Sequence, residues 1–179
     1  MSTLLINAFS PDGPHEELVS AAAAAVRAPV RRDLVGSPFE GFMTADEHAA
    51  YHSETPLIEE ATRQAAEDVA GSGALLFTYP TVAGTVPAVL KSWLERVLVP
   101  GVGFVFDAKG RVAPGMTQIS RLGVVTVQAP MNGRRDGGRR TILRTIRLNC
   151  AKRCHTTWLA LDDSEVGRTG RVTEALSGW

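Results

Sequence analysis

Residues 75–97 read LLFTYPTVAGTVPAVLKSWLERV, and this stretch decides the fold. It begins as a continuous apolar run of strand length, which is typical of a strand buried on both faces. The run breaks at the turn-rich residues 80–85. It resumes as a helical pattern with Pro87 near the first turn, where a missing N–H group costs nothing, and with Leu90 and Leu94 at helical spacing. The pattern predicts a strand, a loop and a helix, and in an open α/β sheet ligands bind at such a loop.

Length and composition are those of an ordinary globular protein. The chain has 179 residues, of which 44% are hydrophobic and 21% charged, and this suits one domain spanning residues 1–179. No apolar run is long enough to cross a bilayer, and no signal peptide is evident. Two cysteines do not suggest a disulfide framework. We therefore expect a cytoplasmic protein that makes no contact with a membrane.

The formal net charge is zero, but the charges are unevenly distributed along the chain. Residues 1–70 hold twelve acidic and four basic side chains, whereas residues 134–153 hold eight basic side chains and one acid, Asp136. Such segregation indicates either an anion-binding face or a solvated helix face. We do not expect nucleic-acid binding, because no binding motif accompanies the basic segment and the pI is about 6.9.

Further strands and helices are predicted on both sides of the central unit. We expect strands over residues 3–8, 30–34, 122–127 and 156–161. We expect helices over residues 15–27, 55–69, 141–153 and 168–176, and a short helix after a capping box at 44–47. Thr55 and Pro56 have the pattern of an N-cap and a first helical residue. Strands that alternate with helices predict a parallel α/β sheet with helices on both faces, joined by right-handed crossovers.

The pattern YPxxxGxxPAxLKxWxxRVxxPGxxF, from Tyr79 to Phe104, resembles the central signature of the flavodoxin-like NAD(P)H:quinone oxidoreductases of the DT-diaphorase type. Residues 32–52 extend the resemblance upstream. The resemblance implies a flavodoxin-like three-layer sandwich with a five-stranded parallel sheet in the order 2-1-3-4-5. It also implies a bound flavin (FAD or FMN), NAD(P)H as the hydride donor, a quinone-like or other small electron acceptor, and a homodimer.

The resemblance places the flavin where three loops meet at one edge of the sheet. The expected cofactor-binding residues are Ser10, His15 and Glu16 in the first loop, Pro80, Thr81, Val82, Ala83 and Gly84 in the second, and Thr126, Val127, Gln128 and Ala129 in the third. No catalytic side chain is expected, because the flavin carries the hydride chemistry. Arg134 and Arg135 are candidates for the 2′-phosphate of NADPH or an anionic substrate, since the planar guanidinium suits that task, and a solvated loop is the alternative.

All three loops depart from the family pattern, and two functions therefore stay open. Glu16 puts a carboxylate where a phosphate would sit, although it also suits the helix dipole with no ligand present. The segment around Val82 lacks the aromatic residues of the family's flavin platform. In the turn that contains Gln128, a larger residue replaces the family glycine that lets the backbone approach the flavin closely. The chain is either a flavin-dependent NAD(P)H oxidoreductase or a divergent member with weak or lost flavin binding that acts as a small-ligand binding or partner protein.

Two pairs of potential metal ligands are interpreted as structural. His48 and His52 are spaced to share a helix face, but no third ligand follows nearby, so we expect no metal site. Cys150 and Cys154 could form a redox or metal pair with His155, yet two such cysteines are more often small buried groups.

Overall fold

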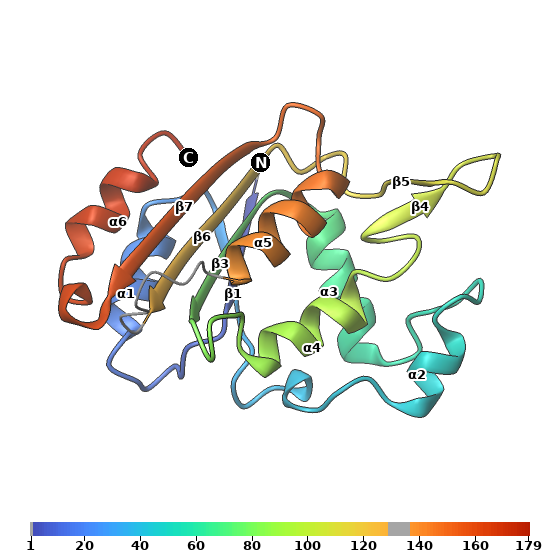
Figure 1. Cartoon of the computed structure of the whole chain (residues 1–179), viewed down its shortest axis with the longest axis horizontal. Helices are drawn as coiled ribbons and strands as arrows, with labels where there is room; N and C mark the ends of the chain where they lie inside the picture. The colour runs from blue at the N-terminus through green and yellow to red at the C-terminus, as the bar shows by residue number, and fades with distance from the viewer. Residues whose placement is uncertain (1, 129–136) are drawn as a thin grey trace.

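A five-stranded parallel sheet is the centre of the computed structural model, which describes residues 2–128 and 137–179 (Figure 1). Its strand order is β2-β1-β3-β6-β7. The strands are β1 (Ser2–Asn7), β2 (Pro29–Asp33), β3 (Ser72–Pro80), β6 (Arg121–Gln128) and β7 (His155–Asp162). The small strands β4 (Phe104–Phe106) and β5 (Val112–Pro114) form a separate antiparallel hairpin. The predicted order 2-1-3-4-5 is therefore confirmed for the five long strands.

Helices cover both faces of the sheet, which confirms the predicted three-layer arrangement (Figure 1). On one face lie α1 (Glu16–Ala24) and α6 (Thr169–Ala175). On the other lie α3 (Glu60–Ala70), α4 (Ala88–Val97) and the helical segment that begins with α5 (Gly137–Arg140). Each face has its own cluster of buried apolar side chains.

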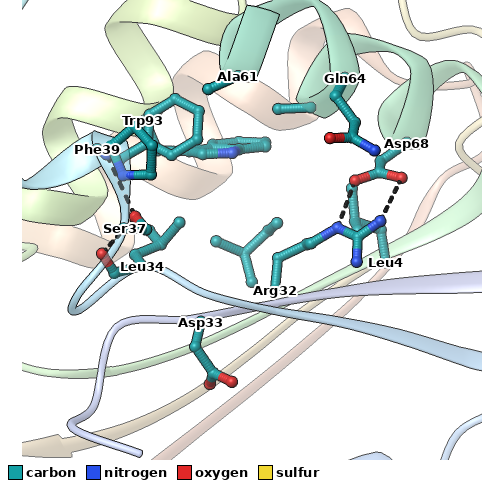
Figure 2. A pocket seen from close by; sticks show the side chains of 13 residues that line it. Leu4, Arg32, Asp33, Leu34, Ser37, Phe39, Ala61, Gln64, Asp68 and Trp93 are labelled. Carbon is teal, nitrogen blue, oxygen red and sulfur yellow. Dashed lines mark hydrogen bonds and ion pairs between the residues drawn. The ribbon is translucent and has the colours of Figure 1, made fainter.

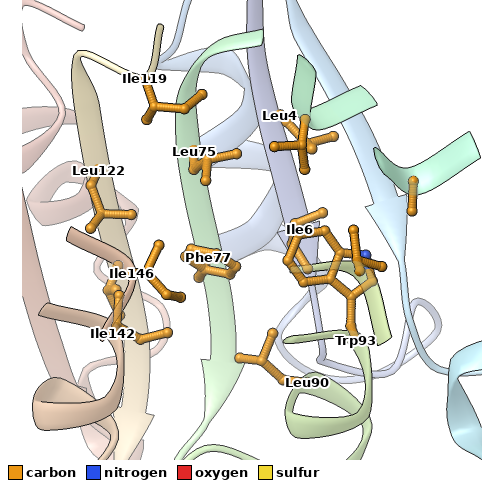
Figure 3. Close-up of a cluster of buried hydrophobic side chains, with 14 of the residues drawn as sticks. Leu4, Ile6, Leu75, Phe77, Leu90, Trp93, Ile119, Leu122, Ile142 and Ile146 are labelled. Carbon is orange, nitrogen blue, oxygen red and sulfur yellow. The ribbon is translucent and has the colours of Figure 1, made fainter. Parts of the chain in front are cut away.

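The central strand β3 supplies side chains to both clusters. Leu75 and Phe77 belong to the cluster under α3 and α4, while Leu76 belongs to the cluster under α1 and α6. Figure 3 shows Phe77 beside Leu90 and Trp93, which α4 contributes to the same core. Because both faces of β3 are covered, its sequence is a continuous apolar run rather than an alternating one.

A buried ion pair joins α4 to the segment that follows β2. Arg96 Nε donates to Glu47 Oε1 at 2.8 Å, and the two side chains are only 6% and 5% exposed. Arg96 Nη1 also donates to the carbonyl oxygen of Pro38 at 2.8 Å. The guanidinium carbon lies 5.3 Å from the centre of the Phe39 ring, a cation–π distance. The guanidinium is thus paired, hydrogen-bonded and stacked, as a buried charge requires.

The predicted capping box at the start of α2 (Ala45–Ala50) is confirmed, and it also holds Glu47 for this ion pair. Glu47 N donates to Thr44 Oγ1 at 3.1 Å, and Thr44 N donates to Glu47 Oε2 at 2.9 Å. Burial alone would raise the pKa of Glu47, but the hydrogen bonds from Thr44 and Arg96 outweigh burial and lower the pKa. Glu47 is therefore held as a carboxylate.

The predicted helix start at residues 55–56 is wrong, because α3 begins at Glu60. Leu57 packs against the core instead of continuing a helix. The carbonyl oxygens of Leu57 and Ile58 accept hydrogen bonds from Arg63 Nη1 at 3.3 and 2.9 Å. Burial of Leu57 and these side-chain hydrogen bonds outweigh the local N-cap signal.

The predicted helix over residues 141–153 begins earlier and ends earlier. It starts with α5, continues as a π-helical segment, η2 (Thr141–Ile146), and closes with a 3₁₀ turn, η3 (Arg147–Asn149). It ends because Cys150 leaves the helix in an extended conformation and forms a bridge with Met116. The interpretation of the two cysteines as small buried groups is confirmed, since both are free thiols at most 6% exposed.

The strand bounds agree with the sequence analysis to within one residue for β1, β2, β6 and β7. No helix within residues 2–128 and 137–179 combines the length and the apolar character needed to span a membrane. The assignment of residues 1–179 to one domain and the cytoplasmic location stay predictions.

Replacing Arg96 with alanine tests the buried ion pair. We expect Arg96→Ala to lower the free energy of unfolding by about 3–5 kcal/mol, because Glu47 would stay buried without its partner. Urea unfolding at pH 7 measures the change. Lys91→Ala is the matched control on α4, since its exposed pair with Glu95 is worth only about 0.3–0.5 kcal/mol. A loss below about 1 kcal/mol for Arg96→Ala would contradict the assigned role.

Candidate functional site

Three loops leave the sheet at the carboxyl ends of β1, β3 and β6, which lie at one edge because the strands are parallel (Figure 1). Backbone hydrogen bonds continue the pairing into these loops. Ala8 N donates to Thr78 O at 2.8 Å, and Thr81 N donates to Val127 O at 2.7 Å. The ends of the three central strands are therefore in register with one another, as in the ligand-binding edge of doubly wound sheets.

The loop between β3 and α4 is a tight two-residue turn. Val82 N donates to Thr85 O, and Thr85 N donates to Val82 O, both at 3.0 Å. The two residues between them have positive φ angles, 49° at Ala83 and 77° at Gly84. Positive φ at both central positions defines a type I′ turn, which glycine adopts freely and alanine adopts at a cost.

This turn presents hydrogen-bond donors and one apolar side chain to solvent. Within residues 2–128 and 137–179, no acceptor takes the backbone N–H groups of Ala83 and Gly84. The Val82 side chain beside them is 52% exposed. Pro80, the last residue of β3, is half-buried opposite Val127. The predicted residues of this loop thus form a small surface with free donors and an apolar flank.

The turn is anchored to the start of the last helical segment. Gly137 N donates to the carbonyl oxygen of Gly84 at 2.7 Å. A Cβ atom at position 137 would lie 2.8 Å from that oxygen, closer than side-chain carbons approach backbone, so only glycine allows this contact.

At the end of β6 the predicted side chains face the core more than the solvent. Thr126 and Val127 are buried, and Gln128 is half-buried. The hydroxyl oxygens of Thr126 and Thr81 lie 3.0 Å apart in a hydrogen bond that ties this loop to the preceding one. The predicted residues Ala129, Arg134 and Arg135 lie outside the described residues.

The loop between β1 and α1 carries the other three predicted residues. Ser10 is exposed. The ring of His15 stacks on that of Phe9, with the ring centres 4.6 Å apart and the planes 22° from parallel. Glu16 accepts two hydrogen bonds from Arg31, at 2.6 and 2.7 Å. The carboxylate that the sequence places at the phosphate position is therefore neutralised by an arginine on β2.

A buried asparagine beneath this loop joins three strands and was missed by the sequence analysis. Asn7 is fully buried, and its Nδ2 donates to Asp33 Oδ1 at 2.7 Å. Its Oδ1 accepts from Phe9 N at 3.1 Å and from Thr78 Oγ1 at 2.9 Å. Arg31 Nε donates to the same Asp33 oxygen at 2.9 Å. The sequence contains one sign of this cluster, because Asn7 ends an otherwise apolar strand and a buried amide needs hydrogen-bond partners.

The arrangement can bind a ligand, but it contains no reactive constellation. No group of three His, Cys, Asp or Glu side chains that could hold a metal ion occurs in the described part of the chain. The edge offers backbone donors, the exposed Val82 and the stacked His15 ring. These features suit a flat molecule with polar atoms on its rim.

All but the last residues of the sheet match a known family. Residues 1–160 match the family model described as the flavodoxin-like fold. The chain belongs to this family. The resemblance stated from the central motif is thereby confirmed, and the carboxyl edge of this flavodoxin-like protein is the edge at which ligands bind in such sheets.

Proteins similar to the flavodoxin-like protein include two that are named as quinone oxidoreductases. An FMN-dependent NADH:quinone oxidoreductase from Gluconacetobacter diazotrophicus is 35% identical over 83 residues, which are 45% of this chain and 41% of that relative. The chain thus spans less than half the length of this curated relative. An NAD(P)H:quinone oxidoreductase from Methanothermobacter marburgensis has a TM-score of 0.79 at 18% identity, covering 99% of this chain and 98% of that one.

An FMN-dependent NADH-azoreductase from Bacillus anthracis, solved in complex with FMN, has a TM-score of 0.72 at 12% identity and covers 98% of this chain and 97% of that one. At identities this low, the two solved structures share the fold with the flavodoxin-like protein.

The pair between Glu16 and Arg31 predicts a pH-dependent stability. The hydrogen bonds from Arg31 lower the pKa of Glu16 below its ordinary value of 4.5. A lowered carboxyl pKa gives stability that is present above the ordinary pKa and is lost as the pH falls through the folded-state pKa. We expect Glu16→Gln to cost about 0.5–1 kcal/mol at pH 7, the range of a partly exposed pair, and almost nothing near pH 2.

Chemical denaturation at several pH values measures this difference. Glu17→Gln, at the neighbouring exposed position of α1, is the matched control. A cost that is the same at pH 7 and in acid would mean that the Arg31 pair does not stabilise the loop.

Proposed function

We propose that the protein is a flavin-dependent oxidoreductase that takes hydride from NAD(P)H and passes the electrons to a quinone-like or other small acceptor, with FMN as the flavin. The observation that carries this proposal is the 35% identity to an FMN-dependent NADH:quinone oxidoreductase. The free donors of the type I′ turn, placed at the carboxyl edge of a flavodoxin-like sheet, support it.

The residues at this edge fit a flavin. The N–H groups of Ala83 and Gly84 would donate to polar atoms of the ring, and Val82 would pack against its apolar part. Ser10 and His15 would lie toward the phosphate. Arg31 neutralises Glu16, so the carboxylate does not stand as an unpaired charge against a phosphate. The flavin itself supplies the hydride chemistry, and the protein supplies position and polarity.

The second candidate function is a binding or partner protein that has kept the fold and lost tight flavin binding. One observation favours it: no aromatic side chain stands in the β3–α4 turn, where Val82 is the exposed apolar residue. The two candidates differ in whether FMN binds at micromolar concentration and whether the complex turns over.

Titration with FMN, followed by the change in flavin and tryptophan fluorescence, tests the proposal. We expect saturable binding of FMN, and oxidation of NADH or NADPH by the loaded protein when menadione is present. FAD is titrated in parallel, because the choice of FMN rests on the relatives. No binding of either flavin at high micromolar concentration would overturn the proposal in favour of the second candidate.

The variant Val82→Trp tests whether FMN lies against the β3–α4 turn. An indole at this exposed position adds aromatic contact worth roughly 0.5–1.5 kcal/mol, so FMN should bind up to about tenfold more tightly. Leu148→Trp is the control, because Leu148 is 68% exposed in η3, just before the amino end of β7 and away from the flavin edge. If both variants changed the FMN affinity equally, the flavin would not be in contact with position 82.

We also propose that the protein forms a homodimer. The hairpin of β4 and β5 supports this, because its cross-strand partners Phe106 and Val112 are 52% and 66% exposed. Exposed apolar patches of this kind mark interfaces. Sedimentation velocity should give about twice the chain mass of 19.1 kDa, and Val112→Lys should shift the protein toward the monomer. A wild-type monomer at micromolar concentration would contradict the dimer.

A further inference from the structure

A cavity of about 240 Å³ lies on the α3 and α4 face of the sheet, beneath its β1–β2 side (Figure 2). Its apolar walls include Leu4 and Ile6 of β1, Phe39, Ala65 of α3 and Trp93 of α4. None of the residues predicted to bind flavin lines it. The cavity is therefore a site separate from the flavin edge.

The volume suits one or two fused rings. A cavity of roughly 150 Å³ lined by apolar side chains stays free of water and binds benzene. The present cavity is larger, and its mainly apolar lining also includes Arg32, Gln64 and Asp68 at one side.

One wall carries a hydrogen-bond donor with no partner. Trp93 is only 1% exposed, and its indole N–H makes no hydrogen bond with residues 2–128 or 137–179. Figure 2 shows the Trp93 side chain among the residues that line the cavity, beside Phe39. An indole N–H of a largely buried side chain usually finds a partner, so this donor is available to an acceptor atom of a ligand.

The charged side chains that line the cavity, Arg32, Asp33 and Asp68, are all held in ion pairs. Arg32 Nε and Nη2 donate to the two carboxylate oxygens of Asp68 at 2.6 and 3.0 Å (Figure 2). Gln64 lies beside this pair on α3 and is exposed. Because Asp68 neutralises Arg32, the cavity favours a neutral molecule over an anion.

We propose that this cavity binds a neutral, flat aromatic molecule of one or two rings that carries a carbonyl group, whose oxygen accepts the hydrogen bond of the Trp93 indole. The rings lie between the apolar side chains of β1 and α3. The proposal is independent of flavin binding, because it concerns different residues.

Acetophenone, a neutral aromatic ketone, is the probe, and the indole N–H signals in ¹H–¹⁵N correlation spectra of the full chain are the readout. The chain has three tryptophans, so Trp158→Phe and Trp179→Phe assign the Trp93 signal by elimination. We expect a saturable shift of the Trp93 signal at millimolar acetophenone, both in the protein as purified and after addition of FMN. A shift that grows linearly without saturation, or no shift, would overturn the proposal.

Ethylbenzene has nearly the same shape but no acceptor atom, so it tests the hydrogen bond. We expect it to bind about five- to tenfold more weakly than acetophenone, the effect of one net hydrogen bond. Equal affinity of the two probes would overturn the role of the Trp93 N–H. This comparison uses the wild-type protein and so does not depend on a variant that folds.

Ala61→Leu fills the cavity from α3, where Ala61 lines it and is half-buried. We expect at least tenfold weaker binding of acetophenone. Ala70→Leu makes the same change at an exposed position of the same helix and should leave binding unchanged. Unchanged Trp158 and Trp179 signals report that each variant is folded. Full binding by Ala61→Leu would place the probe elsewhere and overturn the proposal.

Discussion

The pairing of Arg96 with Glu47 constrains the side of the molecule around α4 more than any other polar contact. Two charges are withdrawn from water, and this is tolerated because hydrogen bonds and the Phe39 ring surround the guanidinium. The pair holds residues 38–47 over α4, and Ser92 Oγ adds a hydrogen bond to the carbonyl oxygen of Gly41. Phe39, held in this way, forms a wall of the cavity that Trp93 lines. Helix α4 therefore has two roles. Its apolar face packs into the core, and its Arg96 holds the long connection between β2 and α3.

The carboxyl edge of the sheet is built differently, from backbone groups that are positioned by buried polar side chains. Asn7 joins the ends of β1, β2 and β3, and the hydroxyls of Thr81 and Thr126 join the loops after β3 and β6. None of these side chains needs to touch a ligand. They fix the strand ends, and the strand ends fix the direction of the N–H groups in the turn at Ala83 and Gly84. Such an edge is suited to hold a cofactor that supplies its own chemistry.

The periodicity of apolar residues predicts the strands of the sheet and both helical layers, because burial on one or both faces leaves a clear pattern in the sequence. The strand order comes from the resemblance carried by residues 79–104. It fails at Thr55, where the burial of Leu57 and the reach of Arg63 outweigh a local cap. For the site, the sequence locates the loops but not their conformation. An alanine at position 83 does not indicate a positive φ angle, because alanine rarely adopts one. The partner of Glu16, Arg31, lies on β2, so the local sequence around Glu16 does not reveal it. Pairings between distant segments decide these details.

The hydrogen bond from Gly137 to Gly84 has a consequence for the order in which the site forms during folding. The two glycines are far apart in sequence, and β6, which pairs with β3, lies between them. Closing such a long loop is entropically costly until the intervening strand has docked. The turn at residues 82–85 is closed by its own hydrogen bonds between Val82 and Thr85, whereas we expect its anchor from Gly137 to form after the central sheet is assembled. A chain stalled before β6 docks would have the β3–α4 unit without its anchored turn.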